Sequence, residues 1–182
     1  MRSPTLVVMV KAPQAGQVKT RLARGIGAVS ATAFYRHATL SLLQRLGRNA
    51  VTPRPNTPSS GRRRDRGSEE WRIVLAVAPD GAVGSSYWPR GFARMPQGGG
   101  DLGQRMQRIM DGLPPGPMVI IGSDCPDVRA QHIRSAFRTL GTNGAVLGPA
   151  AASRVTGRNR ASSWRAWRMV KRSCCSAMVV RM

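Results

Sequence analysis

Short apolar runs, each followed by turn-forming or charged residues, recur along the first 150 residues of the chain. Four of them lack the alternation of a half-exposed strand and have the composition of strands buried on both faces, which is a feature of parallel sheets. The pattern predicts strands over residues 6–10, 73–78, 118–122 and 145–148.

Between these runs, apolar residues recur at the spacing of amphipathic helices. The spacing predicts helices over residues 26–46, 102–110 and 130–140. In the first of them, the pattern assigns the buried face to Phe34, Ala38, Leu42, Leu43 and Leu46, the N-cap to Ser30 and the stop to Gly47. Apolar strands that alternate with helices predict an α/β fold around a mainly parallel sheet.

Residues 52–70 have almost no apolar pattern. They contain three prolines and the run Arg62-Arg63-Arg64-Asp65-Arg66. This composition predicts a flexible, solvated insert. A nucleic-acid-binding arm is the less favoured alternative, because the segment has no aromatic residue on which bases could stack.

Residues 151–182 form a second unusual segment, because they contain eight basic residues and no acidic one. Trp164, Trp167 and Val170 have the spacing of a short amphipathic helix, for which binding to a membrane surface is the less favoured interpretation. We therefore expect one domain over residues 1–150, followed by an atypical basic tail.

Charge and composition narrow the class of partner only slightly. The chain of 182 residues has a net charge of +21, and only three of its 29 basic residues are lysines. This excess favours polyanionic partners such as nucleotides or nucleic acid, although an arginine bias also arises from GC-rich codons. The three cysteines lack the spacing of a disulfide framework or a zinc site. The apolar run at residues 6–10 is too short for a membrane span or a signal peptide, so we expect a cytoplasmic protein.

The first predicted strand is followed by the loop Lys11-Ala12-Pro13-Gln14-Ala15-Gly16-Gln17-Val18-Lys19-Thr20-Arg21-Leu22. A glycine-containing cationic loop between a strand and a helix is typical of phosphate-binding sites. Only two residues separate Gly16 from Lys19, so the loop is not a Walker A motif. Lys11, Gly16, Lys19 and Arg21 are candidate phosphate-binding residues, and a merely solvated surface loop is the alternative.

A second candidate site follows the third predicted strand, in the segment Ile121-Gly122-Ser123-Asp124-Cys125-Pro126-Asp127. Because the carboxyl ends of parallel strands share one edge of the sheet, Asp124 would face the same crevice as Lys19. Mg²⁺ binds one or two carboxylates together with phosphate oxygens of a substrate, so Asp124 is the candidate metal ligand. Asp127 is the less favoured candidate, because it would also suit a helix N-cap. Cys125 has no histidine nearby in the sequence, and we do not expect a thiol nucleophile.

A third candidate segment is glycine-rich and runs from Met95 to Met106. Its consecutive glycines, residues 98–100, would allow a ligand to approach the backbone closely. Gln97 and Arg105 are the side chains that we expect to point toward a ligand. Asp101 is expected to act first as a helix cap and only second as a ligand contact.

The three segments together resemble the bacterial DUF2064 proteins. The motifs that carry the resemblance are Lys-Ala-Pro-x-x-Gly-x-Val-Lys-Thr-Arg-Leu at 11–22, Gln97 with Gly-Asp-Leu-Gly-x-Arg-Met at 100–106, and Ile-Gly-Ser-Asp-Cys-Pro-Asp at 121–127. That family is described as glycosyltransferase-A-like and is related to nucleotide-diphospho-sugar transferases and small nucleotidyltransferases. The resemblance covers residues 5–150 apart from the insert.

The resemblance implies a three-layer α/β/α nucleotide-diphospho-sugar transferase-like (GT-A) fold, truncated or altered at its C-terminus. It also implies that Lys11, Lys19 and Arg21 bind the diphosphate of a nucleotide or nucleotide-sugar donor, and that Asp124 binds Mg²⁺ or Mn²⁺. The implied function is that of a metal-dependent transferase that uses a nucleotide-activated donor. A nucleotidyltransferase acting on a phosphorylated small molecule and a basic nucleic-acid-binding module are the alternatives, and the acceptor and the catalytic base stay unassigned.

The resemblance ends at Ala150. The family pattern continues with Asp-Gly-Gly-Tyr, a second acidic element of the site, whereas this chain continues without an acidic residue. We hypothesise that residues 151–182 are translated in a shifted frame, since Val155-Thr156-Gly157 can be encoded by bases that read Tyr-Trp in another register. If residues 151–182 are instead genuine as written, the strands that complete the family's domain are missing, which puts the stability and activity of this chain in question.

Resequencing the DNA around codon 150 tests this hypothesis. We expect an Asp-Gly-Gly-Tyr reading in another register directly downstream of Ala150. An intact frame with no such reading in any register would contradict the hypothesis.

Overall fold

The computed structural model describes residues 3–48, 50, 70–142, 145–147 and 179–181. Its elements, in chain order, are β1 (Thr5–Lys11), α1 (Thr20–Ile26), α2 (Ala28–Gly47), β2 (Arg72–Ala78), the 3₁₀ turn η1 (Asp80–Ala82), β3 (Ala93–Pro96), α3 (Leu102–Asp111), β4 (Met118–Gly122), α4 (Ala130–Thr142), β5 (Ala145–Leu147) and β6 (Val179–Arg181).

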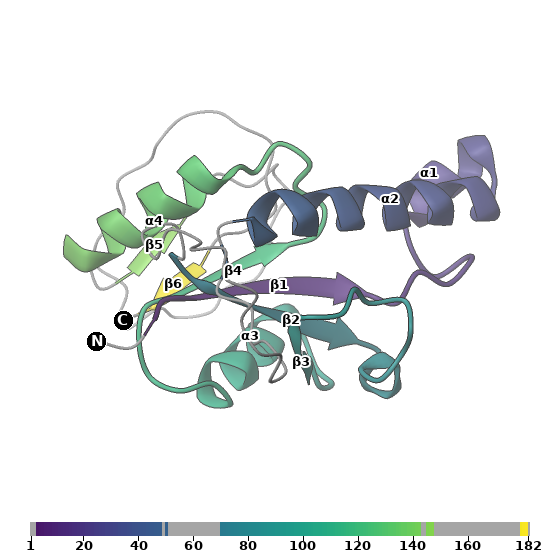
Figure 1. Ribbon diagram of the computed structural model, residues 1–182. Coiled ribbons are helices and arrows are strands. Elements are labelled where there is room, and N and C mark those ends of the chain that lie inside the picture. The colour runs from purple at the N-terminus through teal and green to yellow at the C-terminus, as the bar shows by residue number, and fades with distance from the viewer. Residues whose placement is uncertain (1–2, 49, 51–69, 143–144, 148–178, 182) are drawn as a thin grey trace, which may run out of the picture.

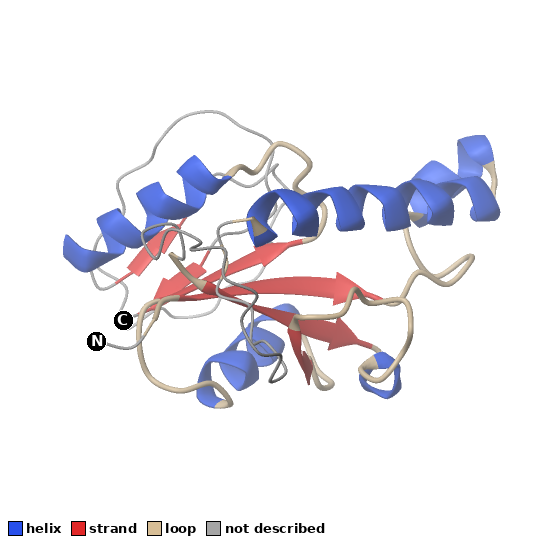
Figure 2. Ribbon diagram, viewed as in Figure 1, coloured by secondary structure: helices blue, strands red, loops and turns tan. Residues whose placement is uncertain are grey.

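The strands form one six-stranded sheet in the order β3-β2-β1-β4-β6-β5 (Figure 1). The pairs β1–β2, β1–β4 and β2–β3 are parallel, whereas β6 is antiparallel to both β4 and β5. Helices α2 and α4 cover one face of the sheet and α3 covers the other (Figure 2). This arrangement confirms the expected three-layer α/β/α fold around a mainly parallel sheet.

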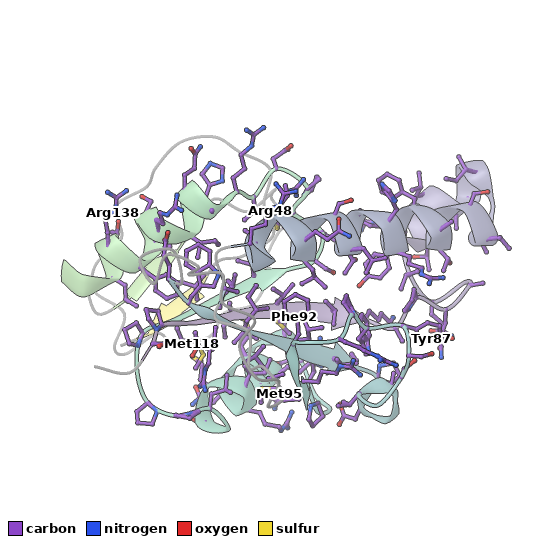
Figure 3. The ribbon with its side chains drawn as sticks, viewed as in Figure 1. Arg48, Tyr87, Phe92, Met95, Met118 and Arg138 are labelled. Carbon is purple, nitrogen blue, oxygen red and sulfur yellow. The ribbon has the colours of Figure 1, made fainter. Side chains whose placement is uncertain are left out.

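Strand β1 is buried on both faces because alternate side chains enter two different clusters. Leu6 and Val8 pack in the cluster that contains the buried faces of α2 and α4. Val7 packs in the second cluster with Ile109 of α3, to which Met118 and, at its margin, Met95 also contribute (Figure 3). Burial on both sides explains why the strand is a continuous apolar run rather than an alternating one.

The helix predicted over residues 26–46 corresponds to α2, and Leu42, Leu43 and Leu46 of its predicted face are buried. Its start and its N-cap differ from the prediction: Ile26 is the last residue of α1, and Gly27, where φ is 84°, separates α1 from α2. Gly27, not Ser30, is the N-cap of α2, and Gly47 is the last residue of the helix rather than a stop beyond it. The cause is glycine, which adopts a positive φ that breaks the helix with little strain.

Phe34 does not belong to the buried face of α2, since its side chain is 54% exposed. The buried stripe consists of Ala31, Tyr35, Thr39, Leu42, Leu43 and Leu46. The N-terminal part of α2 extends past the end of the sheet together with α1 (Figure 1). Apolar spacing was wrong for Phe34 because this part of the helix has no sheet beneath it to cover, whereas the predicted Leu42, Leu43 and Leu46 are buried.

Sequence analysis did not predict two strands, β3 and β6. Strand β3 is half-exposed at the edge of the sheet, so it has no apolar run. Strand β6 comes from the predicted basic tail, and its backbone pairs with β4 and β5 inside the sheet. The boundary expected at residue 150 therefore does not separate this strand from the domain. Residues 52–69 of the predicted insert and residues 151–178 of the predicted tail lie outside the described residues.

The packing of α2 against the sheet predicts a large effect at Leu42, which is fully buried. We expect Leu42→Ala to lower the free energy of unfolding by about 2–5 kcal/mol, because the lost side chain leaves a cavity. Val29 of the same helix is 76% exposed, and Val29→Ala should change this free energy by about 0.5 kcal/mol or less. Urea denaturation measures both values, and equal losses would contradict the assigned face of α2.

Candidate functional site

The carboxyl ends of β1, β2 and β4 meet at one edge of the sheet and border a cavity of about 350 Å³. Its polar lining includes the cationic side chains of Lys11, Lys19 and Arg105 and the carboxylate of Asp124. The crevice outside the carboxyl ends of the strands is where open α/β sheets bind ligands. Parallel pairing thus brings together residues that are more than a hundred positions apart in the sequence.

The loop after β1 approaches the cavity through a series of turns. Gly16 has a φ of 77°, and Lys19, the N-cap of α1, has the left-handed values φ 48° and ψ 42°. Val18 is buried and anchors the loop between these two positions. Lys11 and Lys19 line the cavity, whereas Gly16 and Arg21 are exposed outside its lining.

Lys19 and Asp124 form an ion pair across the cavity. The distance from Lys19 Nζ to Asp124 Oδ1 is 3.0 Å, and the two side chains are 28% and 50% exposed. The loop after β1 and the loop after β4 therefore meet through opposite charges. This contact is the pairing of a cationic loop with a carboxylate that the sequence predicted.

Tyr35 joins the same two loops from the side of α2. The backbone N–H of Lys11 donates to Tyr35 Oη at 2.8 Å, and Tyr35 Oη lies 3.0 Å from Ser123 Oγ. Both Tyr35 and Ser123 are buried, and both line the cavity. Sequence analysis missed these two residues, although the position of Ser123 next to Asp124 was an available signal.

Gln97 lines the cavity, but its amide group is largely engaged by the backbone. Gln97 Nε2 donates to Val10 O at 3.0 Å and to Ala76 O at 2.8 Å. The side chain thus bridges β1 and β2, and only its Oε1 is left for a ligand. Gln97 therefore lies at the cavity as expected, but its amide N–H groups satisfy two buried carbonyls.

The other residues of the glycine-rich segment divide between cavity and helix cap. Arg105 Nε donates to Gly100 O at 2.9 Å, and its side chain lines the cavity. Asp101 is the N-cap of α3 and forms a capping box with Gln104. The cap expected for Asp101 is confirmed, and the residue lies outside the cavity lining.

Asp127 and Cys125 lie apart from the cavity lining. Asp127 is exposed and is not the N-cap of α4, because the helix begins only at Ala130. At this end of α4, the backbone N–H of Arg129 donates to His132 Nδ1 at 3.2 Å instead. Cys125 is fully buried in the core.

Within the described residues, no group of three or more His, Cys, Asp and Glu side chains could hold a metal ion. Asp124 is the one carboxylate among the described residues that line the cavity. Such a donor set suits Mg²⁺ or Mn²⁺ only if a bound ligand supplies further oxygens, which is a common arrangement with substrate phosphates. The residues therefore fit a cation that binds together with a phosphorylated ligand. In the same part of the chain, no helix has the length and apolar character needed to cross a membrane.

Comparisons with known proteins agree with this fold. The DUF2064 family, described as "Uncharacterized protein conserved in bacteria", matches residues 64–152 and confirms the resemblance expected from the motifs. The "putative nucleotide-diphospho-sugar transferase" from Desulfovibrio desulfuricans G20 has a similar crystal structure, with a TM-score of 0.63 and 26% sequence identity. The match covers 82% of this chain, and the chain spans only 59% of the length of that protein. No curated protein matches the chain.

The hydrogen bonds of Tyr35 predict a stability effect that is separate from ligand binding. We expect Tyr35→Phe to lower the free energy of unfolding by about 1–3 kcal/mol, because it leaves buried groups without their partner. Tyr87→Phe is the matched control, since Tyr87 is 41% exposed (Figure 3); it should cost about 0.5 kcal/mol or less. Chemical denaturation compares the two, and a silent Tyr35→Phe would show that the hydroxyl does not join the loops.

Proposed function

We propose that the protein is a divalent-metal-dependent transferase of the glycosyltransferase kind, which uses a nucleotide-activated donor. The observation that carries the proposal is the cavity at the carboxyl edge of the sheet, which is lined by Lys11, Lys19, Arg105 and Asp124 and in which Lys19 pairs with the carboxylate of Asp124. The similarity to the nucleotide-diphospho-sugar transferase structure supports the same class.

The charges of the cavity suit a diphosphate. In transfer from a nucleoside diphosphate sugar, negative charge develops on the leaving diphosphate, and fixed cations stabilise it. Lys11, Lys19 and Arg105 would supply these cations in our proposal. The volume of about 350 Å³ lies within the usual range for small-molecule sites. Gly16 and Arg21 stay candidates for the outer part of the donor site, since they lie on the same loop.

Asp124 would hold Mg²⁺ or Mn²⁺ together with phosphate oxygens of the donor. When bound, such a cation neutralises charge on the leaving group. Ser123 would position this carboxylate, because its backbone N–H donates to Met9 O at 3.0 Å and its hydroxyl lies beside Tyr35. Asp127 is the less favoured metal ligand in this proposal, as it lies outside the cavity lining.

Two other functions use the same chemistry differently. A nucleotidyltransferase would bind a nucleoside triphosphate and a phosphorylated small molecule in this cavity. A nucleic-acid-binding module would instead use the chain's excess of basic residues. The identity of the bound nucleotide separates the first alternative from the proposal, and the salt dependence of binding separates the second.

Isothermal titration with UDP-sugars, GTP and CTP, each with Mg²⁺ or Mn²⁺, tests the proposal. We expect metal-dependent binding of a nucleotide sugar that Asp124→Asn abolishes. Lys19→Ala should weaken binding by roughly tenfold, the scale of one charge-assisted contact. Preference for a free triphosphate would favour the nucleotidyltransferase.

The outcome that would overturn the site assignment is nucleotide binding that is indifferent to both substitutions. Strong binding of any polyanion, with a steep dependence on salt and no effect of Asp124→Asn, would favour the nucleic-acid-binding module.

A further inference from the structure

We propose that the Lys19–Asp124 ion pair masks two sites at once, the cation site at Asp124 and the phosphate site at Lys19. Binding of either ligand breaks the pair and makes the site of the other ligand accessible. The inference rests on the proposed function, since it assigns the two residues to a divalent cation and to a phosphate group. It adds a regulatory property of this site: cation and diphosphate bind synergistically, and each alone binds weakly.

The composition of the cavity means that the ion pair affects the binding of both cations and anions. Asp124 is the only carboxylate among the described residues that line it, whereas three cationic side chains line the same space. A cation that enters must therefore use Asp124, whose Oδ1 is 3.0 Å from the ammonium of Lys19. The ammonium both occupies the carboxylate and repels the incoming cation. A diphosphate that enters finds Lys19 already paired.

The backbone of the loop after β1 holds Lys19 in this position. Lys19 has φ 48° and ψ 42°, a left-handed conformation that residues other than glycine rarely adopt. It is also the N-cap of α1, and its side chain makes no capping hydrogen bond there. Instead the ammonium lies across the cavity at Asp124. The conformation of the loop thus places Lys19 at the cavity, where its ammonium pairs with Asp124.

The solvent exposure of the ion pair determines how strongly it hinders ligand binding. The two side chains are 28% and 50% exposed, so water and salt screen their attraction. Ion pairs of this kind correspond to about 1.4- to 5-fold in an equilibrium constant. The ion pair is thus weak enough for a ligand to break, and its effect on the binding constants is large enough to measure.

The consequence is a reciprocal coupling between the two ligands. A diphosphate attracts Lys19 away from Asp124 and leaves the carboxylate free for a cation. A cation at Asp124 likewise releases Lys19 for phosphate. Thermodynamic linkage requires that both effects be equal in size. A free cation or a free polyanion would each bind more weakly alone than the two ligands bind together.

Binding of Mn²⁺ alone to the full chain, followed by electron paramagnetic resonance of free Mn²⁺, tests the first half of the inference. Lys19→Met removes the competing ammonium, and we expect it to tighten Mn²⁺ binding by roughly 2- to 5-fold. Arg24→Met is the matched control, because it removes the same charge from an exposed position on α1. It should leave Mn²⁺ affinity within about 1.4-fold of the unmodified protein.

Binding of inorganic pyrophosphate alone, in the presence of a chelator, tests the second half. Asp124→Asn frees Lys19, and we expect it to tighten metal-free pyrophosphate binding by roughly 2- to 5-fold. Asp111→Asn is the control, because it removes an equal charge from an exposed position at the end of α3, outside the cavity lining. It should have a smaller effect.

The two halves distinguish the inference from the proposed function. If Asp124→Asn abolishes Mn²⁺ binding while Lys19→Met does not tighten it, the mask is refuted and the metal site stands. If Lys19→Met and its control tighten Mn²⁺ binding equally, the effect is one of net charge and the mask is again refuted. If Mn²⁺ binds neither the unmodified protein nor Lys19→Met, both the inference and the proposed metal site are wrong.

Discussion

Strand β1 lies at the centre of the parallel strands with both of its faces buried, between α2 and α4 on one side and α3 on the other. A charged side chain within such a strand would be buried without a partner, at a cost of several kcal/mol in the desolvation of the charge. Polar chemistry is therefore confined to the points where strands end. Because β1, β2 and β4 run in the same direction, their ends coincide at one edge. The burial of β1 thus determines where the cavity lies.

At this edge of the sheet, cationic side chains outnumber carboxylates in the cavity lining, which favours the binding of anions. Lys11, Lys19 and Arg105 line the cavity with Asp124 as their single acidic neighbour. One positive charge is cancelled by the ion pair, and the remaining two favour an anionic ligand in a space partly screened from water. A cation gains access to Asp124 most readily when the ligand itself brings negative charge. In our proposal, the preference for a phosphorylated ligand and the need for a cation therefore have the same electrostatic origin.

Sequence patterns predicted the parts of the fold that depend on local burial. Residues 6–10, 73–78 and 118–122 lie within β1, β2 and β4, because strands buried on both faces are apolar throughout. Strand β3 was missed because it is short and partly exposed, and β6 because its place depends on pairing with distant strands. In the cavity, Lys11, Lys19 and Asp124 were predicted from loops that follow predicted strands, and Arg105 was predicted from the glycine-rich segment that leads into a helix. Tyr35 and the backbone contacts of Gln97 were not, since both depend on tertiary packing that no local pattern encodes.

The missed residues explain how the predicted ones are held in place. Tyr35 reaches from α2 to the backbone of Lys11 and to the hydroxyl of Ser123, so one side chain connects the cationic loop with the carboxylate loop. Gln97 connects the adjacent strands through Val10 O and Ala76 O. Buried hydrogen bonds of this kind restrict relative movement, because leaving any of these donors and acceptors unpaired costs free energy. Asp124 and Lys19 are therefore free to exchange partners at the cavity surface, while the loops that carry them stay fixed to the sheet beneath.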